Sequence, residues 1–560
     1  MPYSSRLAPR RRLFTFADQR SAGLPAEAVV LGACVWIVAT GNGAFWQALL
    51  EGRALAEART LGWILAWGVA LTAGHMLLVL PWAWGRLTKP LLALLIVIAA
   101  GAGYFIDRFG IYLDSTMLRN VLRTDVKEAR ELFAWAMLPH LLWHAGLPLW
   151  VLWRIRLRPS GGLFGAAGRR LAWWLVAALA GTLALLSVFQ DAAATMRNRK
   201  EIRFLITPAN VLWSASVVAT QEGRTAARPR EVIGADATRG PAATAPGQRS
   251  RLVVVVVGET ARAANWGLNG YARQTTPQLA AMPDVINFAQ VDSCGTNTEV
   301  SVPCLFSPWG RRQYDEARIR GSQSVLHVMH RAGVQVFWRD NQSGCKGVCE
   351  GLPQEIVEAA AAPTLCDRER CLDEALLVGL DEKLPAKAGT DQLLVLHQLG
   401  NHGPAYDRRY PDAFRRFVPV CDTADLRRCS REQIVNAYDN ALLYTDEVLA
   451  RTIAWLHRRS ATQDVAMIYV SDHGESLGEG GLFLHGLPYA IAPREQTRVP
   501  MVWWMSEGFA SRRGIDLGCL RRRAAQPASH DHLFHSLLGL LDVRTALYDR
   551  TLDLAATCHR

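Results

Sequence analysis

Cysteine is almost absent from the first 290 residues of this sequence, which contain only Cys34. The other ten of the eleven cysteines follow, and eight of them form pairs that are close in the sequence: Cys294/Cys304, Cys345/Cys349, Cys366/Cys371 and Cys421/Cys429. These pairs lack the paired spacing and the neighbouring histidines of a zinc module. Local disulfides in an oxidising compartment explain them better, and Cys519 with Cys558 is a candidate fifth pair.

Charged residues are missing from long stretches of the first 190 residues. Residues 28–50 contain none, and this run is long enough to cross a hydrocarbon core about 30 Å thick. No A-x-A-like cleavage site clearly follows it, so we expect an uncleaved span rather than a signal peptide. Four more apolar stretches are candidate spans, at 60–84, 90–106, 132–153 and 171–190, with Pro139 and Pro148 inside the third of them. The sequence therefore predicts a transmembrane domain of five helices over residues 1–190.

The arginines and lysines of this region predict its orientation in the membrane. They gather in the tail at 1–20 and in the loops at 86–89 and 154–170, and loops rich in Lys and Arg stay in the cytoplasm. With five spans, the chain after residue 190 lies in the periplasm, in agreement with its cysteines. The loop at 107–131 carries acids as well as arginines and is expected to form an amphipathic helix at the membrane surface.

Features of nucleic-acid recognition are also lacking. The formal net charge of +12 would suit a nucleic-acid partner, but the sequence has no nucleic-acid motif and no basic helix with interleaved aromatics. Basic cytoplasmic loops and anionic lipid surfaces account for the charge instead.

After residue 190 the pattern changes to that of a linker and a soluble domain. Residues 191–250 form the linking region, predicted to be helical at first and then, over 220–250, a flexible linker rich in Ala, Gly, Thr, Arg and Pro. In the third region, 251–560, strand-like runs recur at 252–257, 334–338, 393–396, 465–470 and 499–505, with helical patterns between them, notably at 433–457. This alternation predicts a mostly parallel sheet covered on both faces.

Residues suited to catalysis follow two of these strands. The run R-L-V-V-V-V-V-G-E-T at 251–260 leads to Glu259, and V-A-M-I-Y-V-S-D-H-G-E at 465–475 contains Asp472 and His473. Open α/β sheets bind their ligands at the carboxyl ends of strands. Each residue taken singly also has an ordinary explanation, as an acid near a helix N-terminus or as part of a strand-ending turn.

A hydroxyl-rich stretch supplies a candidate nucleophile. The sequence D-S-C-G-T-N-T-E-V-S-V-P-C-L-F at 292–306 is predicted to be a short loop that carries Thr296 and Thr298 between two cysteines, and a polar turn stapled for stability is the ordinary alternative. A threonine hydroxyl needs a base or a metal to activate it. Two carboxylates, an imidazole and this hydroxyl make a suitable tetrahedral shell for zinc, which lowers the pKa of a bound hydroxyl and polarises a phosphoryl oxygen.

The sequence resembles a known family over nearly its whole length. The matching stretches occur in family order: V-V-V-G-E-T at 255–260, C-G-T-N-T-E-V-S-V-P-C-L-F at 294–306, D-N-Q-S-G-C-K-G-V-C at 340–349, L-G-N-H-G-P at 399–404, Y-D-N-A-L-L-Y-T-D at 438–446, S-D-H-G-E-S-L-G-E at 471–479 and L-H-G-L-P-Y-A at 484–490. They are similar to those of the lipid A phosphoethanolamine transferases, the membrane group of the alkaline phosphatase superfamily that includes the mobile colistin-resistance enzymes.

This resemblance implies a fold and a set of site residues. The fold is an N-terminal five-helix transmembrane bundle followed by a C-terminal α/β/α sandwich of alkaline phosphatase type. Thr298 is the implied nucleophile, with Thr296 as its rival, and the implied ligands of one zinc ion (a second is left open) are Glu259, Thr298, Asp472 and His473. The residues implied to face the charge on the phosphoryl group are His402, His485 and Lys346. Those implied to contact the substrate are His397, Asn341 and Gln342, the last often Asn in the family.

The implied reaction takes two steps at a bacterial inner membrane. Phosphoethanolamine passes from phosphatidylethanolamine to Thr298, and then to a phosphate of lipid A in lipopolysaccharide, the modification that underlies resistance to polymyxins. We expect a multi-pass, monomeric enzyme with its catalytic domain in the periplasm.

There are four alternatives at this point. The acceptor could be another envelope glycan, or the chain could be a phosphoglycerol transferase, although the stretch around Thr298 differs from that class. A sulfatase is disfavoured because there is no C-x-P-S-R stretch. A non-catalytic membrane sensor is disfavoured because the set Glu259, Thr298, Asp472 and His473 is complete.

Overall fold

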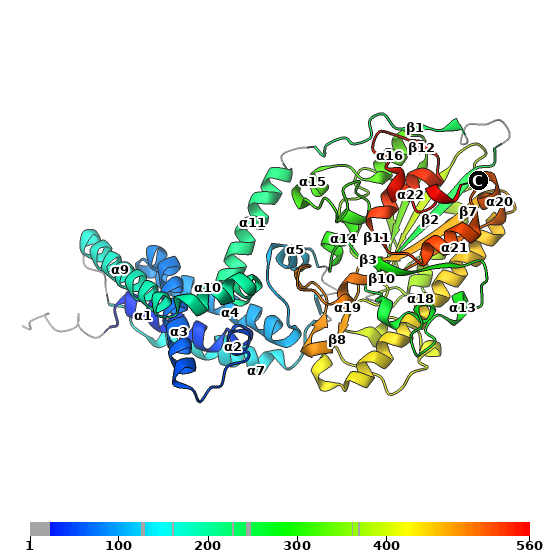
Figure 1. Cartoon of the computed structure of the whole chain (residues 1–560). Helices are drawn as coiled ribbons and strands as arrows, with labels where there is room; N and C mark the ends of the chain where they lie inside the picture. The colour runs from blue at the N-terminus through cyan, green and yellow to red at the C-terminus, as the bar shows by residue number, and fades with distance from the viewer. Residues whose placement is uncertain are drawn as a thin grey trace, which may run out of the picture. The chain divides into compact units, whose positions relative to one another are not determined.

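The structure is a computed structural model, and it describes residues 23–124, 129–130, 132–158, 162–226, 229–241, 248–360, 362–367 and 370–559 of the chain (Figure 1). The chain forms two compact units. Unit 1 consists of Met1–Asp107 and Ala136–Asn210, and unit 2 of Arg108–Trp135 and Val211–Arg560. The basic tail at 1–20, used above to orient the spans, lies outside the described residues.

Unit 1 is helical and apolar. Three of its helical stretches are long and apolar enough to cross a membrane: Ala58–Trp82, which begins with α3 (Ala58–Val79), Gly85–Phe109, which contains α4 (Thr88–Phe109), and Phe164–Ser187, which lies within α9 (Leu163–Ser187). The first predicted span is instead a pair of helices, α1 (Ala26–Thr40) and α2 (Gly43–Leu50), bent by 60°. The described residues thus give three spanning helices, or four if the bent pair counts as one span, where the sequence predicted five.

The predicted span at 132–153 has a different character. It becomes a short helix α7 (Met137–Leu141), a π-helical turn (Leu142–Gly146) and a helix α8 (Leu147–Arg154). Two prolines and two histidines in this run reduce its apolar character, and a π turn marks an irregularity in the helical hydrogen bonding. The helices of this stretch are therefore too short to count among the three that are long and apolar enough to cross a membrane.

The bend between α1 and α2 has a local cause at Asn42, which is almost completely buried. Its amide group donates to the carbonyl of Ile37, 2.9 Å away, and to the carbonyl of Thr207, 3.2 Å away, while its Oδ1 accepts from the backbone N–H of Thr207 at 2.7 Å. A break in a helix frees backbone groups that must find other partners in an apolar environment. One side chain supplies them here.

Unit 2 is built on an eight-stranded sheet with the strand order β11-β3-β10-β7-β2-β6-β4-β5. The strands are β2 (Arg251–Gly258), β3 (Ile286–Asp292), β4 (Gln335–Asp340), β5 (Gln354–Ile356), β6 (Gln392–His397), β7 (Asp464–Ser471), β10 (Arg498–Met505) and β11 (Ala528–Ser529). All neighbours pair in parallel except β10, which is antiparallel to both β3 and β7. The prediction of a mostly parallel sheet is therefore confirmed, and the sheet is mixed because of this one strand.

Helices cover both faces of the sheet, and strand β2 shows why. Val253, Val255 and Val257 contribute to one hydrophobic core, whereas the alternate residues Leu252, Val254 and Val256 contribute to the other. The first core includes residues of α14 (Thr298–Leu305), α16 (Val325–Arg331) and α22 (Asp531–Leu540), and the second includes residues of α18 (Arg431–Arg459) (Figure 1). A strand buried on both faces reads as an unbroken apolar run, as the sequence did.

Two segments outside the main sheet, residues 229–241 and helix α5, pack as parts of unit 2. Residues 229–241 were predicted to be flexible, but strand β1 (Thr238–Arg239) pairs with β12 (Val543–Arg544), and Ile233 is buried in the first core. Helix α5 (Ser115–Arg123), predicted as a surface helix, buries Met117, Leu118 and Arg119. The apolar anchors in 229–241 are too few to produce a periodic pattern, which is why the sequence did not reveal this packing.

The disulfides follow the sequence pairs. The structure forms Cys294–Cys304, Cys345–Cys349, Cys366–Cys371 and Cys421–Cys429, and it also forms Cys519–Cys558. Cys34 is free and buried. All five bridges lie in unit 2.

Candidate active site

The candidate nucleophile Thr298 occupies the start of a helix and not a loop as predicted. It is the first residue of α14, and the side chain of the preceding Asn297 accepts a hydrogen bond from the N–H of Val300 at 3.0 Å. Asn at this position stabilises a helix N-terminus. The helical start was hard to recognise because Pro303 and several β-branched residues lie within the eight-residue helix.

The rival threonine points elsewhere. The hydroxyl of Thr296 donates to the carbonyl of Leu487 at 2.6 Å, so it holds a neighbouring loop. Ser301, one turn into α14, donates to the carbonyl of Asp472 and accepts from the N–H of Gly295. Together with the Cys294–Cys304 bridge, these contacts fix the segment on either side of Thr298.

Thr298, Glu259, Asp472 and His473 converge at the carboxyl ends of β2 and β7. The hydroxyl of Thr298 lies 3.2 and 3.3 Å from the two carboxylate oxygens of Glu259 and 3.5 Å from Nε2 of His473. Nε2 of His473 is in turn 3.3 Å from Oδ2 of Asp472 and 3.4 Å from Oε1 of Glu259. All four side chains are buried. Because β2 and β7 are in register up to Gly258 and Ser471, the residues that follow each strand emerge side by side.

The electrostatics of this cluster favour a positive charge at its centre. Burial, with the nearby charge of Glu259, raises the pKa of Asp472 to about 7. Burial alone would lower the pKa of His473, but Asp472 and Glu259 outweigh it and raise that pKa to about 9. The hydrogen bond and charge of His473 likewise outweigh the burial of Glu259 and hold its pKa below the usual range. Two carboxylates this close in a buried site are stabilised by a positive charge between them.

The donor set fits a metal ion. One ligand atom each from Glu259, Asp472 and His473 lies within 4.8 Å of the others. Nδ1 of His473 lies 2.9 Å from the carbonyl of Gly474, so the Nδ1–H donates there and Nε2 faces the carboxylates as a free ligand, an arrangement typical of metal-binding histidines. Oxygen and nitrogen donors in a set of four with Thr298 match zinc.

Two further histidines border the cluster. The ring of His485 lies 4.3 Å from that of His473 and 5.5 Å from that of His402, measured between ring centroids. Nδ1 of His485 is 2.7 Å from Oε2 of Glu475, whose other oxygen accepts from the hydroxyl of Tyr406 at 2.5 Å. Burial and the charge of His473 lower the pKa of His485. The sequence reasoning did not assign Glu475, although it is the last residue of the D-H-G-E motif.

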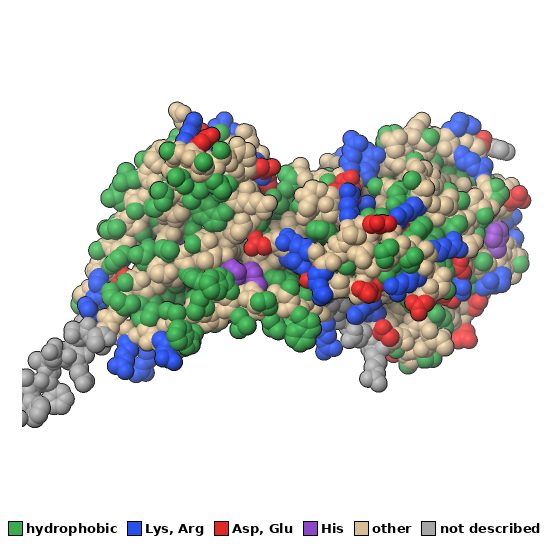
Figure 2. Space-filling model, turned by 90° about the horizontal axis from the view of Figure 1, so that it is seen from below, with side chains coloured by type: hydrophobic (Ala, Val, Ile, Leu, Met, Phe, Trp, Pro, Cys, Tyr) green, Lys and Arg blue, Asp and Glu red, His purple; other side chains and the backbone are tan. Residues whose placement is uncertain are grey.

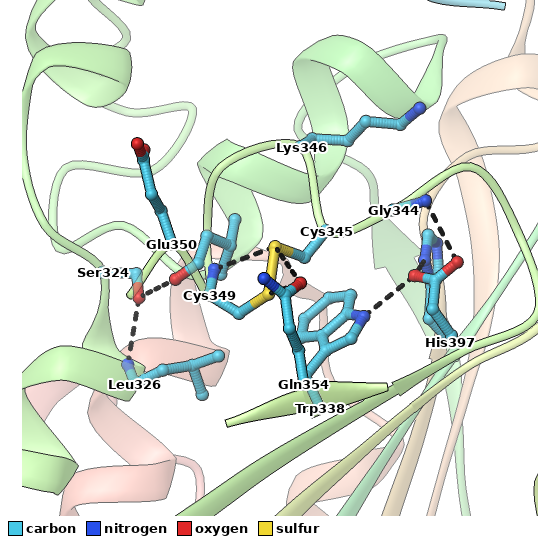
Figure 3. Close-up of a disulfide and its surroundings, with 12 residues drawn as sticks. Ser324, Leu326, Trp338, Gly344, Cys345, Lys346, Cys349, Glu350, Gln354 and His397 are labelled. Atoms are coloured by element: carbon cyan, nitrogen blue, oxygen red, sulfur yellow. Dashed lines mark hydrogen bonds and ion pairs between the residues drawn. A yellow bond between two sulfur atoms is a disulfide. The ribbon is translucent and has the colours of Figure 1, made fainter. Parts of the chain in front are cut away.

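His397 ends the neighbouring strand β6 and bonds to Asp340, the last residue of β4. Their Nδ1 and Oδ2 atoms are 2.8 Å apart, and Trp338 Nε1 donates to the same oxygen at 2.8 Å (Figure 3). Burial lowers the pKa of His397, but the charge of Asp340 outweighs it and raises the pKa overall. Asp340 also accepts from the N–H groups of Gln342 and Gly344, so it organises the loop that follows.

That loop carries three of the predicted site residues, and the structure directs them differently. The amide of Gln342 donates to Oε2 of Glu259 at 3.3 Å, so it reaches the cluster. The amide of Asn341 donates to the carbonyl of Cys371 and to Asp373, at 2.9 and 2.8 Å. The ammonium of Lys346 lies 3.4 Å from a carboxylate oxygen of Glu299 and also bonds to Ser343.

The fold and this buried cluster define a catalytic domain of the alkaline phosphatase and sulfatase type. A sulfatase family model matches residues 251–543, and a model described as phosphoethanolamine transferase EptA/EptB matches residues 71–222. Phosphoethanolamine transferase EptA of Escherichia coli strain K12 is 40% identical over 479 residues, 85% of this chain and 86% of the relative. Phosphatidylethanolamine transferase Mcr-1 of E. coli is 38% identical over 536 residues, 93% of this chain and 96% of the relative.

A solved structure matches most of the chain. The integral membrane lipooligosaccharide phosphoethanolamine transferase A of Neisseria meningitidis matches with a TM-score of 0.91 and 37% identity, covering 96% of this chain and 100% of that chain. The chain therefore belongs to the phosphoethanolamine transferase family of EptA and EptB, and the resemblance found in its motifs is confirmed.

Proposed function

We propose that this chain transfers phosphoethanolamine from phosphatidylethanolamine to a phosphate of lipid A, with Thr298 as the covalent carrier. The observation that carries the proposal is the Thr298 hydroxyl directed at Glu259 and His473 at the ends of adjacent strands. The relatives named above are phosphoethanolamine or phosphatidylethanolamine transferases, and a further one, 28% identical, is a Kdo(2)-lipid A phosphoethanolamine 7''-transferase. These names support the same group and acceptor class for this chain.

Glu259, Thr298, Asp472 and His473 would hold one zinc ion. When bound, zinc lowers the pKa of a ligated hydroxyl and polarises a phosphoryl oxygen. The protein's part is to keep the donors fixed: Asp472 Oδ1 accepts from the N–H groups of Thr260 and His473, at 3.2 and 2.7 Å. Gln342 adds a bond to Glu259. A ligand set held in this way needs little rearrangement on binding the metal.

In the first step, the Thr298 oxygen attacks the phosphorus of phosphatidylethanolamine. The bond from phosphorus to the glycerol oxygen breaks, diacylglycerol leaves as the alcohol after taking up a proton, and phosphoethanolamine remains on Thr298. His485 is suited to take up on Nε2 the proton that the Thr298 hydroxyl loses and to pass it to the departing glycerol oxygen, because its Nδ1–H donates to Glu475 and Nε2 is left unprotonated. His402, whose ring centroid is 5.5 Å from that of His485, is suited to donate to a phosphoryl oxygen.

In the second step, a phosphate oxygen of lipid A attacks the same phosphorus and Thr298 is released. Splitting one displacement into two is the usual advantage of a covalent carrier. Lys346 offers positive charge on the side of Glu299, and Gln342 and His397 are the residues near the cluster that suit contact with the donor. The Asn341 amide is bonded to Asp373, so we expect Asn341 to support the donor-binding loop rather than to contact the donor itself.

The setting of the reaction follows from the apolar unit 1 and the disulfides of unit 2. Unit 1 has helices suited to a membrane, and disulfides persist in oxidising compartments such as the periplasm. We infer a multi-pass protein of the bacterial inner membrane, acting as a monomer, with unit 2 in the periplasm, where donor and acceptor lipids are both within reach.

Mass spectrometry of lipid A tests the proposal. Cells that express the wild-type chain should gain one phosphoethanolamine on lipid A, and cells that express Thr298→Ala should not, whereas Thr296→Ala should retain the gain. A gain with Thr298→Ala would remove Thr298 as the carrier. No gain with wild-type protein present in the membrane would contradict lipid A as the acceptor, and release of diacylglycerol from phosphatidylethanolamine by the purified protein would then show whether the first step stands.

A further inference from the structure

Glu299, the residue after Thr298, is an unusually placed acid. Its side chain has no exposed surface, although it lies in the first turn of α14. A buried carboxylate loses its hydration and is costly to the fold unless cations and hydrogen bonds replace the lost water. The question is what this carboxylate does beside the nucleophile.

Three cations from three different segments surround Glu299. The ammonium of Lys346 lies 3.4 Å from one carboxylate oxygen, and the guanidinium groups of Arg320 and Arg123 lie 3.2 and 3.1 Å from the other. Arg320 belongs to α15 (Glu316–Gly321) and Arg123 to α5. One acid thus joins α14, α15, α5 and the loop at 343–349.

Burial distinguishes the three contacts. The Lys346 side chain is 5% exposed and that of Arg123 is 41% exposed. A charge pair excluded from water interacts more strongly than one that water screens, and exposed pairs contribute little. The Arg320 side chain is 13% exposed, but it has a second anchor in the backbone carbonyl of Glu299 and a third in Glu316. Lys346 is therefore the cation whose position depends most on the Glu299 carboxylate.

Apart from Glu299, the loop that carries Lys346 is held at its ends and by Val348, which is buried and whose carbonyl accepts from the hydroxyl of Ser324 at 2.7 Å. The Cys345–Cys349 bridge closes it, and Figure 3 shows the Lys346 side chain extending away from this disulfide. Lys346 itself has a φ of 50°, a left-handed conformation that is unusual for a residue other than glycine. Besides Glu299, the ammonium bonds only to Ser343 of the same loop among the described residues. Nothing in the bridge directs the ammonium toward α14.

We infer that Glu299 is a positioning residue, which holds the Lys346 ammonium beside the Thr298 end of α14 so that it faces the phosphoryl group during transfer. This inference rests on the proposed function, in which Lys346 offers positive charge to the developing negative charge. The ordinary explanation is that Glu299 is a helix N-terminal acid that stabilises α14. The two differ in what happens to Lys346 when the charge of Glu299 is removed.

A double-mutant cycle separates these explanations. Glu299→Gln keeps the size and a hydrogen-bonding end but leaves three cations without their acid. If Glu299 acts through Lys346, kcat falls about tenfold with KM within about twofold, and the same substitution has no further effect on kcat in a Lys346→Ala background. Arg123→Gln serves as the comparison: it removes the exposed partner of Glu299 and should leave kcat within about twofold of wild type.

Two outcomes would overturn the inference. One is a fall in kcat of the same size with and without Lys346, which would place the role of Glu299 in the helix. The other is a wild-type kcat in Glu299→Gln. Hydrogen exchange gives a readout independent of turnover: residues 343–349 should exchange faster in Glu299→Gln than in wild type, while the exchange of α14 stays the same. Faster exchange confined to α14 would support the ordinary explanation.

Failure of this inference can be distinguished from failure of the proposed function. Wild-type protein that does not release diacylglycerol from phosphatidylethanolamine contradicts the function itself, whatever Glu299 does. Wild-type protein that does so, together with a Glu299→Gln variant of unchanged kcat and unchanged exchange at 343–349, contradicts the positioning role alone. Zinc content measured in each variant shows that the compared samples carry the same metal.

Discussion

Both units bury apolar side chains, but their surfaces differ in chemical character. In unit 1, leucines and tryptophans such as Leu65, Leu179 and Trp150 are more than half exposed, and hydrophobic side chains dominate the face of this unit seen in Figure 2. In unit 2, charged side chains are spread over the visible face (Figure 2). Large exposed apolar surfaces mark contact with a membrane or a partner. The surface of unit 1 therefore suits contact with lipid, and that of unit 2 suits contact with water.

The two units also differ in the purpose of their buried polar groups. In unit 1, Asn42 is buried to satisfy backbone groups at the bend between two helices. In unit 2, Glu259, Asp472 and His473 are buried together, so that two acids compete for one imidazole. The first arrangement lowers the free energy of the fold. The second raises it unless a cation is supplied, and such strained electrostatics is typical of functional sites.

The largest expected effect is on turnover in unit 2. Thr298→Ala should lower the rate of diacylglycerol release from phosphatidylethanolamine by at least about 10³-fold, because among the described residues only the Thr298 hydroxyl bonds to the side chains of Glu259 and His473. Thr296→Ala is the matched control and should retain most activity, since its hydroxyl bonds to Leu487. Equal losses in the two variants would contradict the assignment.

The second largest expected effect is that metal removal destabilises unit 2 and not unit 1. His473→Ala should lose bound zinc, whereas His457→Ala, on the exposed side of α18, should keep it. A metal present at 100 times its dissociation constant stabilises the folded state by about 2.7 kcal/mol. Treatment of wild type with a chelator should therefore lower the thermal unfolding temperature of unit 2 and leave hydrogen exchange in α3 and α9 unchanged. A shift in unit 1 as well would show that the units unfold together.

Loss of a disulfide should have a somewhat smaller effect, again confined to unit 2. Replacing Cys294 and Cys304 by serine should reduce the free energy of unfolding by about 2 kcal/mol, because the bridge limits the unfolded chain. Denaturant unfolding of unit 2 measures this loss. Cys34→Ala, in unit 1, should leave the unfolding of unit 2 unchanged.

The smallest expected effect lies in unit 1. Asn42→Leu leaves the carbonyl of Ile37 and the N–H of Thr207 without their side-chain partner and should cost about 1–3 kcal/mol locally. Hydrogen exchange around 37–43 should become faster while the rate of diacylglycerol release stays within about twofold. A large loss of activity would mean that the bend in unit 1 controls the catalytic cluster.

Much of the fold was visible in the sequence, for a physical reason. A strand buried on both faces must be apolar at every position, so 252–257, 393–396 and 465–470 were recognisable, and the structure extends them to β2, β6 and β7. Strand β3 was missed because only Ile286, Phe288 and Val291 are buried, and these do not form an unbroken apolar run. The helical start at Thr298 was missed because Pro303 hides the pattern.

The cluster of four residues was predictable because each follows a recognisable strand or lies in a short motif. What the sequence did not show is the set of residues that orient them. Glu475 and Tyr406 support His485, and Glu299 holds Lys346, through contacts between segments far apart in the chain. Contacts of that kind depend on how the segments pack, and no local spacing encodes them.

Helix α5 makes unit 2 discontinuous in the sequence. It lies more than a hundred residues before β2, yet its Arg123 reaches Glu299, and its Met117 lies so close to Gly486 that a Cβ atom there would clash. If related genes recombine near residue 230, the exchanged part carries the catalytic sheet but leaves α5 behind with the other parent. The exchanged part must then pack against an α5 from the other parent, and because α5 buries Met117, Leu118 and Arg119, the two stretches are expected to be inherited together.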